Sequence, residues 1–230
     1  MNPYDHAVSS AAIHGGCWRD YHRIHAWFDE TKAAQCHFTH RALRHHVQGA
    51  AEALRVLGTT VRNSNGIEID VAEIGRQHMR EDCGRMPEAS DWLEDFRPAD
   101  WMPTVVDHDA ASLAALSAKR HGDDAKTYLP VHAWFLETSA WADDAAHLLF
   151  RHHAFGIFEA EALFGPVIGT GRHALPTRVL AERHVQTVVG RTPTAADWLR
   201  RIKGERWMVR SPRLAAANDD ATPRNALTAC

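Results

Sequence analysis

The sequence predicts a mainly α-helical protein with a small β-hairpin in each half, built as two tandem homologous domains. The prediction depends on repeated blocks. YHRIHAWFDET at 21–31 aligns with YLPVHAWFLET at 128–138, and THRALRHHVQGAAEA at 39–53 aligns with AHLLFRHHAFGIFEA at 146–160, both at an offset of 107. Later, HMREDCGRMPEASDWL at 78–93 matches HVQTVVGRTPTAADWL at 184–199. We therefore expect copy one at 1–102, copy two at 103–210 and a disordered tail at 211–230, which lacks periodicity.

Helical periodicity accounts for most of copy one. Apolar residues at helical spacing predict one amphipathic helix within 18–31 and a second over 37–58, whose stripe includes Leu43, Val47, Ala50, Leu54 and Leu57. The Asn65-Gly66 pair predicts a hairpin turn, and copy two has GTGRHAL in the corresponding place. A helix ending at Gly84 should follow, then a short last helix within 87–96 anchored by Trp92. An all-α bundle is the alternative.

Composition narrows the class of protein. The 26 basic and 29 acidic residues give a net charge of −3, so nucleic acid is not an expected partner. No run of about eighteen apolar residues and no signal peptide is present, and the four cysteines show no metal or disulfide spacing. These features predict a soluble, cytoplasmic protein without a membrane partner.

Histidine is the unusual component, with 17 in the chain. Residues identical in both copies include His14/His121, His25/His132, His40/His147, Arg44/Arg151, His45/His152, His46/His153, Gly49/Gly156, Glu52/Glu159 and His78/His184. On a continuous helix His45, Gly49 and Glu52 would share one face. Glycine within a helix costs about 1 kcal/mol relative to alanine, so we expect another helix or a bound group to approach there. Inward-facing imidazoles beside a carboxylate are what a divalent metal requires.

The copies differ at two aspartates. Asp29 follows His25, and Asp82 follows His78, each by four residues, which places each pair on one helix face. Copy two keeps both histidines but has Leu136 and Val188 in place of the aspartates. Their joint loss predicts that both aspartates serve one site, which only copy one retains. The alternative is that they form exposed pairs that merely stabilise their helices.

Copy one also resembles a family of small proteins of unknown function from bacteria and phages. The resemblance lies in the His-Ala at 6–7, YHRIHAWFDETK, THRALRHHVQG and HMREDCGRMPEASDWL, in the same order. Copy two matches the Arg-His-His, Gly-Arg-x-Pro and Asp-Trp-Leu blocks but departs at both aspartates. The resemblance implies a phage or mobile-element setting and no established reaction.

Two functions from different classes fit these observations. The first is a metal-dependent hydrolase of a phosphoester or nucleotide, with zinc, manganese or iron as the divalent metal. Its predicted metal ligands are His25, His40, His45, His78 and Asp82, and its predicted catalytic residues are Asp29, Arg44 and Glu52. The second is a non-catalytic interaction module that binds another protein through a fold stabilised by a histidine network. Whether the chain is an enzyme stays open here, as does its oligomeric state.

Overall fold

A computed structural model describes residues 1–142 and 144–209, which form two compact units. Unit 1 contains Met1–Asp91 and the described residues from Gly204 onward, and unit 2 contains Trp92–Lys203. The tail predicted at 211–230 lies outside the described residues. Helices dominate both units, and each contains one two-stranded antiparallel sheet, which confirms the predicted fold class.

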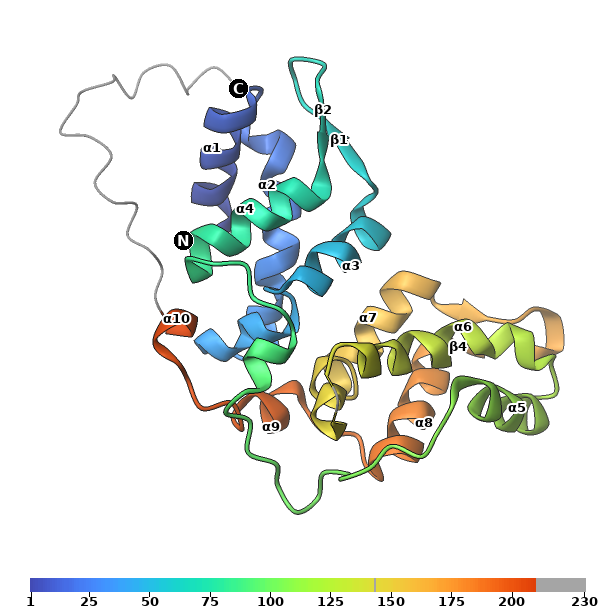
Figure 1. Ribbon diagram of the computed structural model, residues 1–230. Helices are drawn as coiled ribbons and strands as arrows, with labels where there is room; N and C mark the ends of the chain where they lie inside the picture. Colours follow the sequence, from blue (N-terminus) through green and yellow to red (C-terminus); the bar gives the residue numbers. More distant parts are fainter. Residues whose placement is uncertain (143, 210–230) are drawn as a thin grey trace, which may run out of the picture. The chain divides into compact units, whose positions relative to one another are not determined.

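In unit 1, helices α1 (Pro3–His14), α2 (Trp18–Asp29) and α4 (Val71–Cys83) pack together, and α3 (Val47–Leu57) packs on α4 (Figure 1). The short 3-10 helices η1 (Glu30–Ala33) and η2 (Phe38–Leu43) lead from α2 to α3. The hairpin of β1 (Thr60–Arg62) and β2 (Glu68–Asp70) pairs Val61 with Ile69. The predicted last helix is the 3-10 turn η3 (Ser90–Leu93), and α10 (Arg206–Val209) also belongs to this unit.

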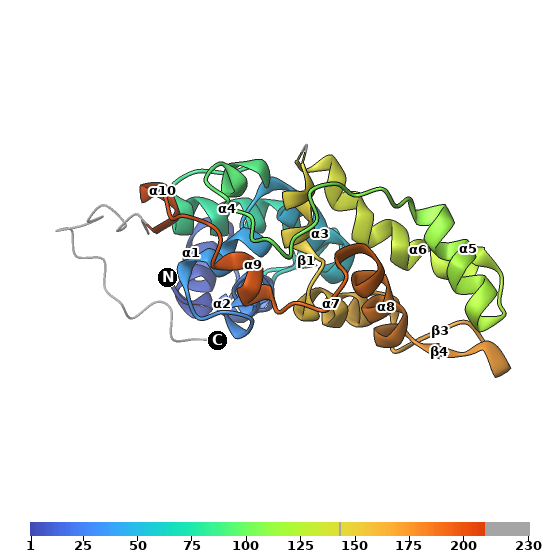
Figure 2. The ribbon, with the colours of Figure 1, turned by 90° about the horizontal axis from the view of Figure 1, so that it is seen from below.

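Unit 2 repeats this order of elements. Its helices are α5 (Ala110–His121), α6 (Ala125–Leu136), α7 (Ala154–Phe164), α8 (Thr177–Val189) and α9 (Ala195–Leu199), with 3-10 helices η4 (Glu137–Ala140), η5 (Ala145–Phe150) and η6 (Gly171–His173). Strands β3 (Val167–Ile168) and β4 (Leu175–Pro176) pair and lead into α8 (Figure 2). The helix α5 corresponds residue for residue to α1, at an offset of 107.

The core of unit 1 forms where the apolar faces of its helices meet. It includes Ala7 and Ala11 of α1, Tyr21, Ile24, Trp27 and Phe28 of α2, Ala53 of α3, and Val71 and Ile74 at the start of α4. The remaining inner face of α4, toward its C-terminus, carries His78 and Asp82, both completely buried. Polar groups thus occupy the part of the interior where apolar side chains end.

The α-helix predicted over 37–58 is wrong over 37–46. The structure has η2, a turn at Arg44 and His45, and then α3, which begins at Val47 with His46 as its N-cap. The His46 Nδ1 accepts a hydrogen bond of 3.0 Å from the Gly49 amide. His45 therefore precedes the helix and shares no helix face with Gly49 and Glu52. Because the chain turns here, His45 points into the interior.

Candidate metal centre

Four buried side chains converge at the centre of unit 1: Asp29, His45, His78 and Asp82. Asp29 is the last residue of α2, His45 lies in the turn before α3, and His78 and Asp82 stand one turn apart on α4. None is more than 4% exposed. Residues separated by up to 53 positions in the sequence, 29 to 82, are thus brought to one point.

The distances between these groups suit a shared metal ion. The His45 Nε2 lies 3.0 Å from the His78 Nε2 and 3.3 Å from the Asp82 Oδ2. The Asp29 Oδ1 lies 3.9 Å from the His45 Nε2 and 4.0 Å from the His78 Nε2. Two ligands that are each about 2.1 Å from one ion lie about 3.0 to 3.4 Å apart in octahedral or tetrahedral geometry, and about 4.2 Å apart when opposite. These distances fall within this range, and all four ligand atoms lie within 4.8 Å of one another.

Asp29 presents a buried oxygen toward the cluster. Its Oδ2 forms an ion pair of 2.7 Å with Lys32, while its Oδ1 accepts no hydrogen bond from the described residues. The two imidazole nitrogens facing Oδ1 are too distant for hydrogen bonds. Leaving a buried acceptor unsatisfied costs about 1–3 kcal/mol, so an additional partner at the centre would stabilise Asp29 in this position.

Asp82 is ionised and surrounded by donors. Arg41 lies 3.0 Å from its Oδ2, and His6 and the Met1 amine lie 3.3 Å and 3.0 Å from its Oδ1. Burial opposes ionisation of this carboxyl, but hydrogen bonds from His45 and His6 outweigh burial and hold its pKa well below the usual range. The cluster therefore contains a carboxylate at any physiological pH.

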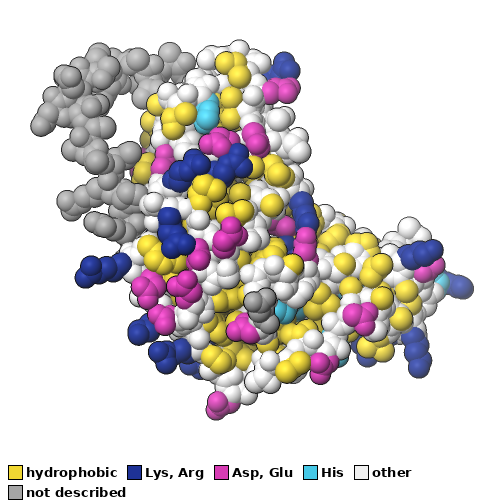
Figure 3. Space-filling view, in the orientation of Figure 1, with side chains coloured by type: hydrophobic (Ala, Val, Ile, Leu, Met, Phe, Trp, Pro, Cys, Tyr) yellow, Lys and Arg dark blue, Asp and Glu magenta, His cyan; other side chains and the backbone are white. Residues whose placement is uncertain are grey.

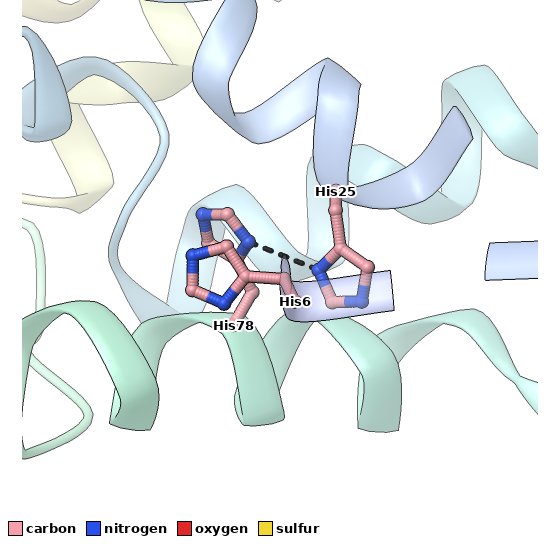
Figure 4. A group of neighbouring side chains, drawn as sticks. All are labelled: His6, His25 and His78. Carbon is pink, nitrogen blue, oxygen red and sulfur yellow. Dashed lines mark hydrogen bonds between the residues drawn. The ribbon is translucent and has the colours of Figure 1, made fainter. Parts of the chain in front are cut away.

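A chain of hydrogen bonds sets the orientation of His78. Ser10 donates to Gln77 (2.8 Å), so the Ser10 oxygen accepts from the His25 Nε2 (2.8 Å). The His25 Nδ1 must then accept from the His78 Nδ1, at 3.0 Å, the bond drawn in Figure 4. This leaves the lone pair of the His78 Nε2 directed at the centre, the arrangement that oriented metal-binding histidines adopt. Burial holds the pKa of His78 well below 6.5 and lowers that of His25 to about 3, so both are neutral.

His6, His25 and His78 form a second group of neighbouring imidazoles (Figure 4). The His6 Nδ1 lies 2.5 Å from Glu81, and its Nε2 faces Asp82. Burial lowers the pKa of His6, but these two carboxylates outweigh burial and raise it. A histidine that favours its protonated form is a poor metal ligand. The group with two carboxylates is therefore the better candidate.

Copy two keeps the histidine chain and loses the charges around it. His132, His184 and His152 are linked at 2.8 and 3.1 Å, and Ser117 contacts His132 at 2.9 Å. The residues that replace His6, Asp29, Arg41 and Asp82 are Leu113, Leu136, Leu148 and Val188. Three of these four apolar side chains are buried, so the same interior position that is charged in copy one is apolar in copy two.

Four other predicted site residues lie outside the group of four. His25 supports His78 from behind, and His40 bonds Thr31 at 2.8 Å. Arg44 donates to the Trp27 carbonyl, pairs with Glu30 and stacks over the Trp27 ring. Glu52 forms an ion pair of 3.4 Å with Arg55 on the outer side of α3.

Sequence reasoning missed three members of the surroundings: His6, Ser10 and Gln77. His6 and Ser10 lie on α1, which was not predicted to be a helix, and Gln77 of α4 joins the surroundings through its hydrogen bond with Ser10. A signal was present nonetheless, because His6 is replaced by Leu113 in copy two, as Asp29 and Asp82 are replaced by Leu136 and Val188. A charged residue in one copy and an apolar one in the other marks this interior site.

A pocket of about 570 Å³ opens beside the cluster, and Asp29 forms part of its wall. Lys32 and Arg23 contribute cationic side chains, and Trp27 and Leu57 contribute apolar surface. Asp29 thus connects the buried cluster with a cavity that a small molecule can enter.

The surface carries no further indication of function on the face seen in Figure 3, where basic and acidic side chains are interspersed and little histidine is visible. Among the described residues, no helix combines the length and apolar character needed to cross a membrane.

The comparison with known proteins agrees with the internal repeat. A family model described as a domain of unknown function (DUF6915) matches residues 1–102 and again residues 108–208. Searches of curated proteins and of solved structures give no match. Copy one and copy two both match along most of their length, so the chain belongs to the DUF6915 family and contains its domain twice.

Proposed function

We propose that copy one binds a divalent transition metal through His45, His78, Asp29 and Asp82. The observation that carries the proposal is the Asp29 Oδ1, a buried acceptor without a hydrogen bond that faces two imidazole nitrogens at 3.9 and 4.0 Å. A cation at the centre would satisfy this oxygen and replace the short contact between the two histidines.

The donor set limits the metal. Two neutral imidazoles and two carboxylates suit zinc, manganese or iron, whereas calcium and magnesium prefer oxygen ligands alone. His25 would be a supporting residue that fixes the ring of His78, and Arg41 would balance the charge of Asp82. Copy two, with Leu136 and Val188, would bind no metal at this position.

Elemental analysis of the full chain, purified without chelator, tests the proposal. We expect about one zinc, manganese or iron ion per chain, and its loss in the Asp29→Asn/Asp82→Asn variant. The matched control is Asp124→Asn, which changes an exposed helix cap in copy two. A folded wild-type chain that stays metal-free after incubation with each of the three ions would exclude the metal centre.

We further propose that the metal centre hydrolyses a phosphate ester or nucleotide bound in the adjacent pocket. What favours this activity is that a candidate ligand, Asp29, lies in the wall of a cavity that Arg23 also lines. Lys32 is paired with Asp29, and Glu30 adds a second carboxylate to the lining, so Arg23 is the cation that would contact an anionic group of the substrate. When bound, such a metal supplies a water molecule of lowered pKa. Trp27 and Leu57 would contact the apolar part of the substrate.

Activity of the metal-loaded chain toward p-nitrophenyl phosphate and nucleoside monophosphates tests the second proposal. The Arg23→Ala variant should keep the metal and lose at least about tenfold in kcat/KM, since Arg23 lines the cavity but is not one of the four candidate ligands. Metal-loaded protein without turnover would instead favour an interaction module in which the metal stabilises the fold.

A further inference from the structure

The end of each copy belongs to the unit formed mainly by the other copy. Residues 92–102, which close copy one, lie in unit 2. Their equivalents, which close copy two, are residues 198–208, and of these 204–208 lie in unit 1. The two ends correspond at an offset of 106, since Trp101-Met102 matches Trp207-Met208.

In unit 1, α10 packs against η2 and α4 beside the candidate metal centre. Met208 is completely buried, and Trp207 lies under the Arg85 guanidinium at 4.8 Å. Arg41 donates to the Met208 carbonyl at 3.2 Å while its other nitrogen pairs with Asp82. The end of copy two therefore holds the arginine that faces the candidate ligand Asp82.

In unit 2, the end of copy one occupies the equivalent position. Trp101 packs edge-on against Trp198, with ring centroids 5.1 Å apart, and Arg191 lies 4.9 Å over the Trp101 ring. Arg191 is the counterpart of Arg85 at the same offset of 106. Met102, the counterpart of Met208, is buried as well. Both units thus contain the same kind of terminal segment.

The two terminal segments also pair with each other, and they do so reciprocally. Phe96 stands opposite Ile202, its own counterpart in the repeat. The Arg97 amide donates to the Arg201 carbonyl at 3.0 Å, and the Lys203 amide donates to the Asp95 carbonyl at 3.4 Å. At the offset of 106, Lys203 corresponds to Arg97 and Arg201 corresponds to Asp95, so the two hydrogen bonds are equivalent. Such reciprocity is the property of a self-complementary interface between two identical partners.

We propose that the last residues of this repeat, 98–102 in copy one and 204–208 in copy two, form an exchange segment whose binding partner is a second copy of the same repeat. In this chain the second copy is covalently attached, so Gly204–Met208 completes copy one and the equivalent residues 98–102 complete copy two. Duplication thereby supplies each copy with its partner segment. The inference depends on packing and pairing and does not require metal binding.

The test compares Met208→Ala with its matched control Met102→Ala in the full chain, by hydrogen exchange and mass spectrometry without metal. Each sulfur accepts an equivalent amide hydrogen bond of 3.3 Å, so the two changes are alike in chemistry. Removing a buried side chain should accelerate exchange at least about tenfold in the elements it contacts. We expect Met208→Ala to affect η2 and α4 in copy one, and Met102→Ala to affect α9 in copy two, where the adjacent Trp101 packs on Trp198.

The opposite pattern, in which Met208→Ala affects α9 and Met102→Ala affects α4, would contradict the proposal that the terminal segments are exchanged between the copies. If either methionine variant fails to fold, Trp207→Ala and Trp101→Ala give the same comparison at less buried positions. Metal affinity provides a second readout, which should fall in Met208→Ala alone. If the hydrogen-exchange patterns are as expected but the chain binds no metal, the exchange segment is supported and the proposed metal-binding function is excluded.

Discussion

His78 has two ring nitrogens, and the fold gives each a separate task. The Nδ1 takes part in a hydrogen-bonded chain that also exists in copy two, whereas the Nε2 faces carboxylates that copy two lacks. Because these hydrogen-bonded histidines are present in copy two without the carboxylates, their role is to stabilise the interior. The carboxylates add charge to that interior, and a buried charge is retained only where it has a partner.

Ser10→Ala tests the link between the histidine chain and the metal. The change removes the hydroxyl that fixes the His25 ring and so loosens the orientation of His78. We expect metal affinity to fall about 10- to 100-fold, measured by competition with a chromophoric chelator. Ser117→Ala removes the equivalent hydroxyl in copy two and should leave metal affinity unchanged. Equal effects of both changes would contradict a site confined to copy one.

The backbone of the preceding turn leaves no room for a side chain at Gly49. A Cβ at this position would lie 2.0 Å from the Arg44 carbonyl oxygen, and one at Gly156 would lie 1.9 Å from that of Arg151. The close neighbour predicted from the sequence is thus neither another helix nor a bound group. We expect Gly49→Ala to lower the free energy of unfolding by about 3 kcal/mol, measured by urea denaturation. Gln48→Ala, the neighbouring change on the same helix, should cost far less.

At the level of elements, α6 contains an internal proline where α2 has Arg23. Pro130 has no amide hydrogen, so the helix lacks one hydrogen bond, and the ring crowds the preceding turn. We expect Pro130→Ala to raise the free energy of unfolding of copy two by about 1–3 kcal/mol. Urea denaturation followed by hydrogen exchange would assign the gain to α6. Arg23→Ala is the matched change in copy one, and a similar gain there would argue against this cause.

The sequence patterns were informative where structure is local. The Asn65-Gly66 turn and the stop at Gly84 are confirmed, since Gly66 has φ +80° and Gly84 has φ +70°. The prediction of a continuous helix over 37–58 was wrong because His46 caps α3 and the chain turns at Arg44. The spacing of apolar residues indicates neither feature. The helix α1 went unpredicted because its buried face consists of His6, Ala7, Ser10 and Ala11 rather than large apolar residues.

The candidate site could be predicted only in part, for a related reason. Comparison of the copies identified Asp29 and Asp82, which do lie in one cluster. Helical spacing paired Asp29 with His25, but the Asp29 carboxylate faces His45 and His78 instead. Spacing along one helix reports which side chains share a face. Which neighbouring helix that face meets depends on tertiary packing, which the pattern does not contain.

At the scale of the whole molecule, both units bury neutral histidines, so their stability should depend on pH. Burial lowers the pKa of His25 from 6.5 to about 3 and that of His132 to about 4. Between pH 6.5 and these values the unfolded chain binds protons that the folded chain does not. Stability is therefore fully present above pH 6.5 and is lost as the pH falls, by roughly 2–3 kcal/mol per such histidine at pH 4.5.

The two units should differ in this acid sensitivity. In copy one, Glu81 and Asp82 raise the pKa of His6, so this residue contributes stability below pH 6.5, which is lost only as the pH rises through its raised value. Copy two has Leu113 at that position and no compensating group. We expect urea denaturation of the full chain with chelator present, resolved by hydrogen exchange, to show that copy two loses stability first between pH 7 and pH 4.5. His6→Leu should bring copy one to the behaviour of copy two, because the proton that His6 binds in the folded state would then be missing. If His6→Leu leaves the pH profile of copy one unchanged, the pairing of His6 with the two carboxylates contributes nothing to acid stability.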